Sequence, residues 1–362
     1  MIRLPKAAYR PGDLIQGEVW INAPTPIPTS GIVLTVVGTE ETDFEVSQEE
    51  EDVMTRHQKT TKCRGINTFY STEATLHSAG SLQAGQWSYA FKLQLPSPLL
   101  PSFYSSKGGQ NTGIIAYKAI ATVRDVSDTN KMGAGVLQGE REILIMSPST
   151  PTAPPVQAGK ASKTEEYVSC GCLKKGSISV ELSLPDGKQY DQGDVVVAEI
   201  RAKNNTAQDF DTIKLLLKRM IKYKTGQVSA YGDAGEKVFR NVGNAATATA
   251  PSGLSAGQSI GYGEDGSDGT SAPLTLQVNI SKDAPLSISN AKLIQCMYLA
   301  EVRIESSRGD GGGGAGGVKG ASATVPITVN STDDPSLFQE VELQVPKGFQ
   351  PTSVGDVVTF TL

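Results

Sequence analysis

The segment 214–224, KLLLKRMIKYK, is the main candidate for a binding site in this sequence. In a β-strand, side chains two positions apart point to the same face. The segment therefore places apolar residues on one face and four lysines on the other: Lys214, Lys218, Lys222 and Lys224. Such a row of ammonium groups, here called the basic stripe, can bind phosphate groups on a protein tail or on anionic lipids. The competing interpretation is a solvated outer sheet face on which lysines protect an edge strand.

Patterns typical of catalysis or metal binding do not occur in the sequence. There is no nucleophile elbow, no H-E-x-x-H, no Walker A motif and no C-x-x-C pair. His57 and His77, the two histidines, fall short of a four-ligand zinc site even with Cys63. We therefore predict a protein that is not an enzyme and that has no catalytic residue, metal or cofactor. Carboxylates from distant positions can meet in space, so a β-sandwich hydrolase stays open as a second interpretation.

Two polar segments are predicted to be loops. The acidic run 40–52 is predicted to be a solvated interstrand loop, unless it is a regulatory or partner-binding loop. The run 307–317 contains an R-G-D triplet and a stretch of glycines. A phosphate-binding loop needs a following helix, whereas residues 321–327 are strand-like. We therefore predict a flexible hairpin tip there.

Length and composition favour two soluble all-β domains. The chain has 362 residues, enough for two domains that hold their cores without disulfides. Its 38 glycines and 20 prolines indicate many turns, and its net charge of −5 gives no indication of nucleic-acid binding. No apolar run reaches the roughly 18 residues that a membrane span needs, and the first residues lack the apolar stretch of a signal peptide. We expect a cytoplasmic protein.

An internal repeat divides the chain. LPKAAYRPGD at 4–13 is similar to LPDGKQYDQGD at 184–194, and each is followed by a strand-like run. We predict that each copy begins with a hairpin, and that apolar residues alternating along strands require two sheets packed face to face. The predicted domains are a sandwich at 1–147, a Pro/Ser/Thr-rich linker at 148–175, a second sandwich at 176–332 and a tail at 333–362.

Several motifs in a fixed order resemble one protein family. They are YRPGDLIQGEV at 9–19, GIVLTVVG at 31–38, WSYAFKLQLP at 87–96, GIIAY at 113–117, CGC at 170–172 and GSISV at 176–180. Each motif alone is weak, but together they cover the chain from about residue 2 to about residue 330. The sequence thus resembles the arrestin superfamily, and within it the α-arrestin (arrestin domain-containing protein) type.

The resemblance implies two tandem antiparallel β-sandwiches of the arrestin-like, immunoglobulin-like kind and an adaptor function. Such a scaffold binds cytoplasmic tails of membrane proteins, phosphorylated ones included, and links them to endocytic sorting, trafficking or ubiquitylation machinery. It contacts anionic membrane, is recruited to the plasma membrane or endosomes, and binds no nucleic acid. The ligase-binding motif P-P-x-Y is missing, since Pro154-Pro155 is followed by Val156-Gln157. A retromer-like sorting subunit and a structural or adhesive tandem Ig-like protein are two competing interpretations of the same chain.

Overall fold

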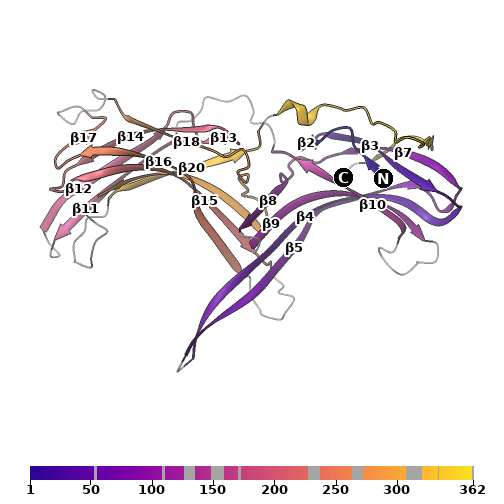
Figure 1. Ribbon diagram of the computed structural model, residues 1–362, viewed down its shortest axis with the longest axis horizontal. Helices are drawn as coiled ribbons and strands as arrows, with labels where there is room; N and C mark the ends of the chain where they lie inside the picture. Colours follow the sequence, from indigo (N-terminus) through magenta and orange to yellow (C-terminus); the bar gives the residue numbers. More distant parts are fainter. Residues whose placement is uncertain are drawn as a thin grey trace.

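The computed structural model forms two β-sandwich bodies joined end to end (Figure 1). It describes residues 1–52, 55–107, 111–125, 135–147, 159–169, 173–226, 237–262, 272–306, 320–332 and 334–360. Within these residues the regular structure consists of strands and one short 3-10 helix, η2 (Pro335–Phe338). The all-β, two-sandwich class predicted from the sequence is confirmed. The glycine-rich run 307–317 and the cysteines Cys170 and Cys172 lie outside the described residues.

The N-terminal body consists of two sheets that pack face to face. The first contains β1 (Ile2–Arg3), β3 (Leu14–Ala23), β7 (Gly85–Gln94), β21 (Thr352–Ser353) and β22 (Val358–Phe360). The second contains β2 (Ala8–Tyr9), β10 (Gly135–Ile145), β9 (Asn111–Asp125), β4 (Ile27–Asp52), β5 (Thr55–His77), β6 (Gly80–Leu82) and β8 (Phe103–Lys107). Alternate side chains of each sheet are buried between them, as the period-2 pattern predicts.

The C-terminal body repeats this topology. One sheet contains β11 (Gly159–Ser169), β12 (Leu173–Leu184), β14 (Val195–Asn204), β17 (Ser259–Ile260) and β18 (Leu274–Asn279). The other contains β13 (Gln189–Asp191), β20 (Ser322–Asn330), β19 (Ile294–Glu305), β15 (Phe210–Lys224) and β16 (Val238–Leu254). Its order, β13-β20-β19-β15-β16, reproduces β2-β10-β9-β4-β5 of the N-terminal body. The repeat seen in the sequence is therefore a duplication of one sheet topology.

The Gly-Asp turn that opens each copy joins two sheets and does not form the predicted hairpin. β2 pairs in parallel with β10, whereas β3 belongs to the opposite sheet. The Asp13 carboxylate accepts a hydrogen bond from the Arg10 amide at 2.8 Å, and Gly12 has a φ of 88° that favours glycine. Asp194 and Asp191 make the same 2.8 Å contact in the second copy. The hairpin prediction was wrong because a tight turn can also carry the chain from one sheet to the other.

The acidic run 40–52 is also not a loop. It is the second half of β4, which pairs with β5 from Ile32–His77 to Asp52–Thr55, and the two strands extend away from the sandwich (Figure 1). Buried positions continue in phase along β4, from Ile32, Leu34 and Val36 to Glu40 and Phe44. The loop was predicted from the high charge of the run. That prediction was wrong because every second side chain of β4 is covered by protein as far as Phe44.

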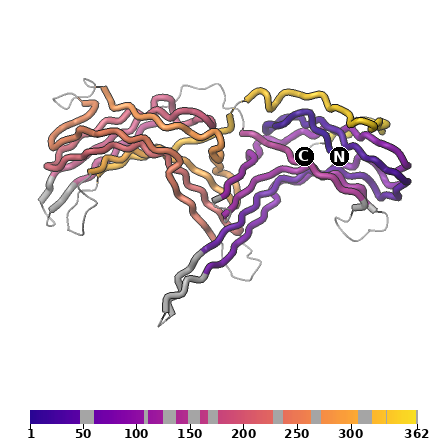
Figure 2. Tube along the Cα trace, in the orientation of Figure 1, coloured from indigo at the N-terminus to yellow at the C-terminus, as the bar shows by residue number. Residues whose placement is uncertain are grey.

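The segment predicted as a linker and the segment predicted as a tail both contain strands. β11 falls within the segment predicted as linker, but residues 159–169 pair with β12 in the first sheet of the C-terminal body. Residues 334–360 return to the N-terminal body (yellow in Figure 2), where β21 and β22 pair in parallel with β7. Phe349 stacks on the buried Trp20 with ring centroids 5.1 Å apart. The tail thus forms part of the N-terminal sandwich.

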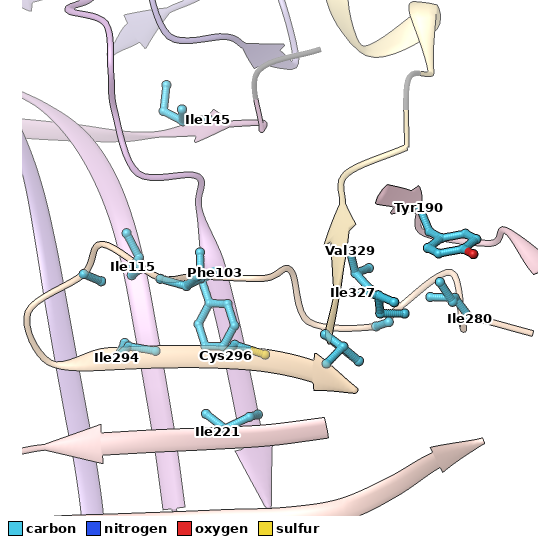
Figure 3. Close-up of a cluster of buried hydrophobic side chains, with 14 of the residues drawn as sticks. Phe103, Ile115, Ile145, Tyr190, Ile221, Ile280, Ile294, Cys296, Ile327 and Val329 are labelled. Carbon is cyan, nitrogen blue, oxygen red and sulfur yellow. The ribbon is translucent and has the colours of Figure 1, made fainter. Parts of the chain in front are cut away.

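One hydrophobic core runs through both bodies. Figure 3 shows Phe103 of β8 and Ile115 of β9, from the N-terminal body, beside Ile294 and Cys296 of β19. Each of these four side chains is at most 4% exposed. The contact between the bodies is therefore an extension of their cores and not a polar surface contact.

Candidate functional site

The basic stripe lies on β15, the strand next to the edge strand β16. Ile213, Leu215, Leu217, Ile221 and Tyr223 are buried in the core, whereas all four lysines of the stripe are half-buried on the opposite face. The structure therefore places the predicted residues together on one face. β16 and β19 flank β15, so the stripe is not itself at the sheet edge.

Two of the four lysines are neutralised by acids of the neighbouring strand β19. The Lys214 ammonium lies 2.5 Å from a Glu305 carboxylate oxygen, and both side chains are partly exposed. Lys218 pairs with Glu301, whose side chain is only 7% exposed. A lysine that already has a carboxylate partner attracts a second anion less strongly. The half of the stripe nearer to the start of β15 is therefore a poor anion site.

Glu301 is the centre of a small charge network. Arg303 also donates to its carboxylate, with Nε 2.5 Å from Oε1. Burial alone would raise the pKa of Glu301, but the hydrogen bonds from Lys218 and Arg303 lower it below its ordinary value. The ionised form of Glu301 is thus favoured by folding.

This network predicts an acid-sensitive contribution to stability. Because the pKa of Glu301 is lower in the folded state, its contribution is present above the unfolded-state value of 4.5 and is lost as the pH falls through the folded-state value. At neutral pH we expect Glu301→Gln to lower the free energy of unfolding by about 1–3 kcal/mol. Thermal melts followed by circular dichroism should show that difference shrinking at acidic pH. A difference that persists there, or one equalled by Glu305→Gln at the more exposed pair, would contradict the prediction.

The other half of the stripe gains a cation from β16. Lys222 lies directly between Arg240 of β16 and Gln295 of β19, so its side chain and that of the exposed Arg240 share one face. Neither cation pairs with an acidic side chain in the part of the chain that the structure describes. We call Lys222 and Arg240 the cationic pair. The sequence did not indicate Arg240, because only the register of β15 with β16 brings it beside Lys222.

The cationic pair lies near the junction between the two bodies. Tyr223, the residue after Lys222, forms a three-ring cluster with Phe44 of β4 and Phe239 of β16, in which the ring centroids are 6.1 to 6.3 Å apart. Thr42 donates a hydrogen bond of 2.7 Å to the backbone carbonyl of Lys224. Tyr223 and Phe239 thus face the N-terminal body, whereas Lys222 and Arg240, their neighbours along each strand, project from the opposite face of the sheet.

Glu40 of β4 is the main polar contact across this junction. Its carboxylate is 1% exposed and accepts hydrogen bonds from the backbone amides of Leu293 at 2.6 Å and of Lys292 at 3.1 Å, just before β19 begins. The Asn67 side chain donates a third, longer hydrogen bond of 3.3 Å. A buried carboxylate is stable only when hydrogen bonds replace its hydration. Glu40 thus fixes β4 to the start of β19.

A cavity of about 200 Å3 lies in the N-terminal body between β3 and the strands β9 and β10. Its lining is largely apolar, with Val19, Ile21, Ile32 and Val123 among its residues, and includes no acidic, histidine or cysteine side chain. This cavity does not provide the carboxylates that a hydrolase would need. Among the described residues, no helix is long and apolar enough to cross a membrane.

Comparison with known proteins agrees with the architecture. Two sandwiches of the same topology with a shared core define a two-domain β-sandwich protein. Residues 2–138 match the family of arrestin (or S-antigen) N-terminal domains. Arrestin domain-containing protein A of Dictyostelium discoideum is similar to the chain, with 26% identity over 242 residues that cover 62% of the chain and 38% of the relative. The chain therefore spans well under half of that relative's length. The relationship to the arrestin superfamily predicted from the sequence is confirmed by the match of residues 2–138 to the arrestin N-terminal domain and by this distant relative.

Proposed function

We propose that this chain is a non-catalytic arrestin-like adaptor, which binds cytoplasmic regions of membrane proteins and links them to endocytic sorting, trafficking or ubiquitylation machinery. The observation that supports this most strongly is an arrestin N-terminal domain joined through a buried junction to a second sandwich of the same topology. Arrestin-family proteins are generally non-catalytic. The adaptor works in the cytoplasm and is recruited to the plasma membrane or to endosomes by its cargo.

The proposed cargo site is centred on the cationic pair. Lys222 and Arg240 project from adjacent strands on the face of the sheet opposite to the core, and Lys224 lies two residues beyond Lys222 on the same face. A guanidinium and an ammonium on one face match a phosphate group on a cargo tail, because charge-assisted hydrogen bonds to phosphate are strong. Lys214 and Lys218 contribute less, since Glu305 and Glu301 already hold them.

Binding of phosphorylated peptides tests this site. We expect Lys222→Glu/Arg240→Glu to weaken the binding of a fluorescent phosphoserine peptide about 10- to 100-fold, as the loss of one or two charge-assisted hydrogen bonds predicts. Fluorescence anisotropy measures the dissociation constant. The control Lys160→Glu/Lys282→Glu makes the same change in net charge at two exposed positions. Lys160 lies on β11 and Lys282 follows β18, and both strands belong to the other sheet of the C-terminal body. Equal weakening in both variants would show a general charge effect and would contradict the site.

Recovery of partners tests the adaptor function itself. The wild-type chain and the two double variants are used to capture proteins from detergent-solubilised membranes and from cytosol, and the bound proteins are identified by mass spectrometry. We expect membrane proteins and sorting factors with the wild type and fewer of them with the Lys222/Arg240 variant. Unchanged recovery would contradict the site but leave the adaptor, whereas recovery of no membrane protein would contradict the adaptor.

A further inference from the structure

The strand β16 presents a long open edge. It is the last strand of its sheet and pairs with β15, and no described strand pairs with its other edge. Most of its residues between Arg240 and Thr249 are exposed, with Val242 60% exposed. An open edge carries backbone donors and acceptors that fit another strand.

Other long edges in the described structure are charged or covered. The topologically equivalent strand β5 carries Lys62, Arg64 and Glu73, and the tail strands β21 and β22 cover β7. In contrast, residues 241–254 of β16 contain no charged side chain. Charged residues on an edge strand normally prevent pairing with another chain. The edge of β16 lacks this protection over most of its length.

The outer face next to this edge carries an apolar row. Met297 of β19, Met220 of β15 and Val242 of β16 are directly paired across the three strands, so their side chains lie side by side. Met297 is 42% exposed and Val242 is 60% exposed. The row ends at the open edge without an apolar neighbour on the far side of Val242 among the described residues.

We propose that a second copy of this chain covers the edge, with the two β16 strands antiparallel about a two-fold axis at Val242. Val242 then faces Val242 of the second copy, and the apolar row continues across one sheet through both copies. In the same register Arg240 faces Asn244 of the second copy. The axis therefore brings no like charges together. An isologous contact of this kind closes as a dimer and does not propagate.

The regular part of β16 limits the length of this pairing. A register shift opposite Leu217 and Lys218 leaves Ala245 as an extra residue of β16, which is a β-bulge. The residues from Arg240 to Asn244 lie before the bulge, so the two-fold at Val242 uses an unbroken segment. This makes Val242 the position at which a single substitution affects both copies most.

Sedimentation of the intact chain tests the dimer. We expect the weight-average mass to rise from 38.2 kDa towards twice that value as concentration increases. Val242→Lys places two ammonium groups face to face at the axis, and we expect it to remain monomeric at concentrations where the wild type is dimeric. Val341→Lys makes the same change at a valine that is 66% exposed elsewhere, and should dimerise like the wild type. A wild type that stays monomeric throughout would overturn the proposal, whether or not the edge binds a strand of another protein.

Cysteine cross-linking tests the register. In a background with Cys170 and Cys172 changed to serine, Val242→Cys should give a disulfide-linked dimer under mild oxidation, because directly opposed Cβ atoms on antiparallel strands lie about 5 Å apart. Asn244→Cys is the matched control, since residue 244 faces Arg240 and not its own copy across the axis. Equal cross-linking at both positions, or none at 242 in a dimeric protein, would overturn the two-fold at Val242.

Discussion

Replacing Glu40 with alanine separates the unfolding of the two β-sandwich bodies. The substitution leaves the amides of Lys292 and Leu293 without their acceptor at the junction, and each unsatisfied buried donor costs about 1–3 kcal/mol. We therefore expect the contact between the bodies to weaken by about 2–4 kcal/mol. Within the N-terminal sandwich the substitution removes only the longer hydrogen bond from Asn67.

The two tryptophans make this separation measurable. Trp20 and Trp87 both lie in the N-terminal body, so their fluorescence reports its unfolding, whereas far-ultraviolet circular dichroism reports both bodies. The two signals should change together during urea unfolding of the wild type and at different urea concentrations in Glu40→Ala. Glu41→Ala is the control, since Glu41 is more exposed and pairs with Arg64 at the surface. Coincident, unshifted transitions in Glu40→Ala would show that its carboxylate does not hold the bodies together.

Replacing Asn204 with aspartate destabilises the C-terminal body by about 3–5 kcal/mol at neutral pH, as expected for an uncompensated buried charge. Asn204 is fully buried at the end of β14, and its Nδ2 donates to the carbonyls of Gln208 at 2.7 Å, Ser255 at 3.1 Å and Leu254 at 3.3 Å. A carboxylate would place a charged oxygen against these three carbonyl oxygens. Its Oδ1 contacts with Thr206, at 2.7 and 3.0 Å, would remain.

The effect of Asn204→Asp should depend on pH. Burial and the carbonyl oxygens raise the pKa of the introduced carboxyl in the folded state, so the folded protein holds the proton more tightly than the unfolded chain. Stability is therefore regained as the pH falls, and the loss should be smaller near about pH 4, the ordinary pKa of aspartate, than at neutral pH. Asn205→Asp introduces the same charge at the exposed neighbour and serves as the control. A pH-independent loss, or an equal loss at residue 205, would contradict the buried-charge explanation.

The all-β class and the duplication were accessible from the sequence because both depend on local patterns. The alternation of β14 and β15 follows from side chains two residues apart, which share a face of any strand. The repeated Gly-Asp turn is visible because Gly12 and Gly193 must adopt positive φ values. The same local information could not show that each turn crosses between sheets, since a turn does not specify which strands pair.

The candidate site was only partly predictable. The lysines of the basic stripe share a face because they lie on one strand, and this follows from their spacing. Their partners Glu301 and Glu305 come from β19, some eighty to ninety residues away, and Arg240 comes from β16. The sequence therefore indicated where positive charge lies but not which lysines are neutralised.

By itself the sequence determined the secondary structure type, the division into two similar halves and the face on which the stripe lies. It did so because strand periodicity and turn chemistry depend on neighbours a few residues apart. Only the tertiary structure decided that Glu40 is a buried junction residue and not part of a solvated acidic loop. Glu40 meets its donor partners Lys292 and Leu293 across more than 250 sequence positions, with hydrogen bonds of 3.1 and 2.6 Å that no local pattern encodes. Burial of a charge is stable only when such distant donors are supplied, and the fold alone supplies them.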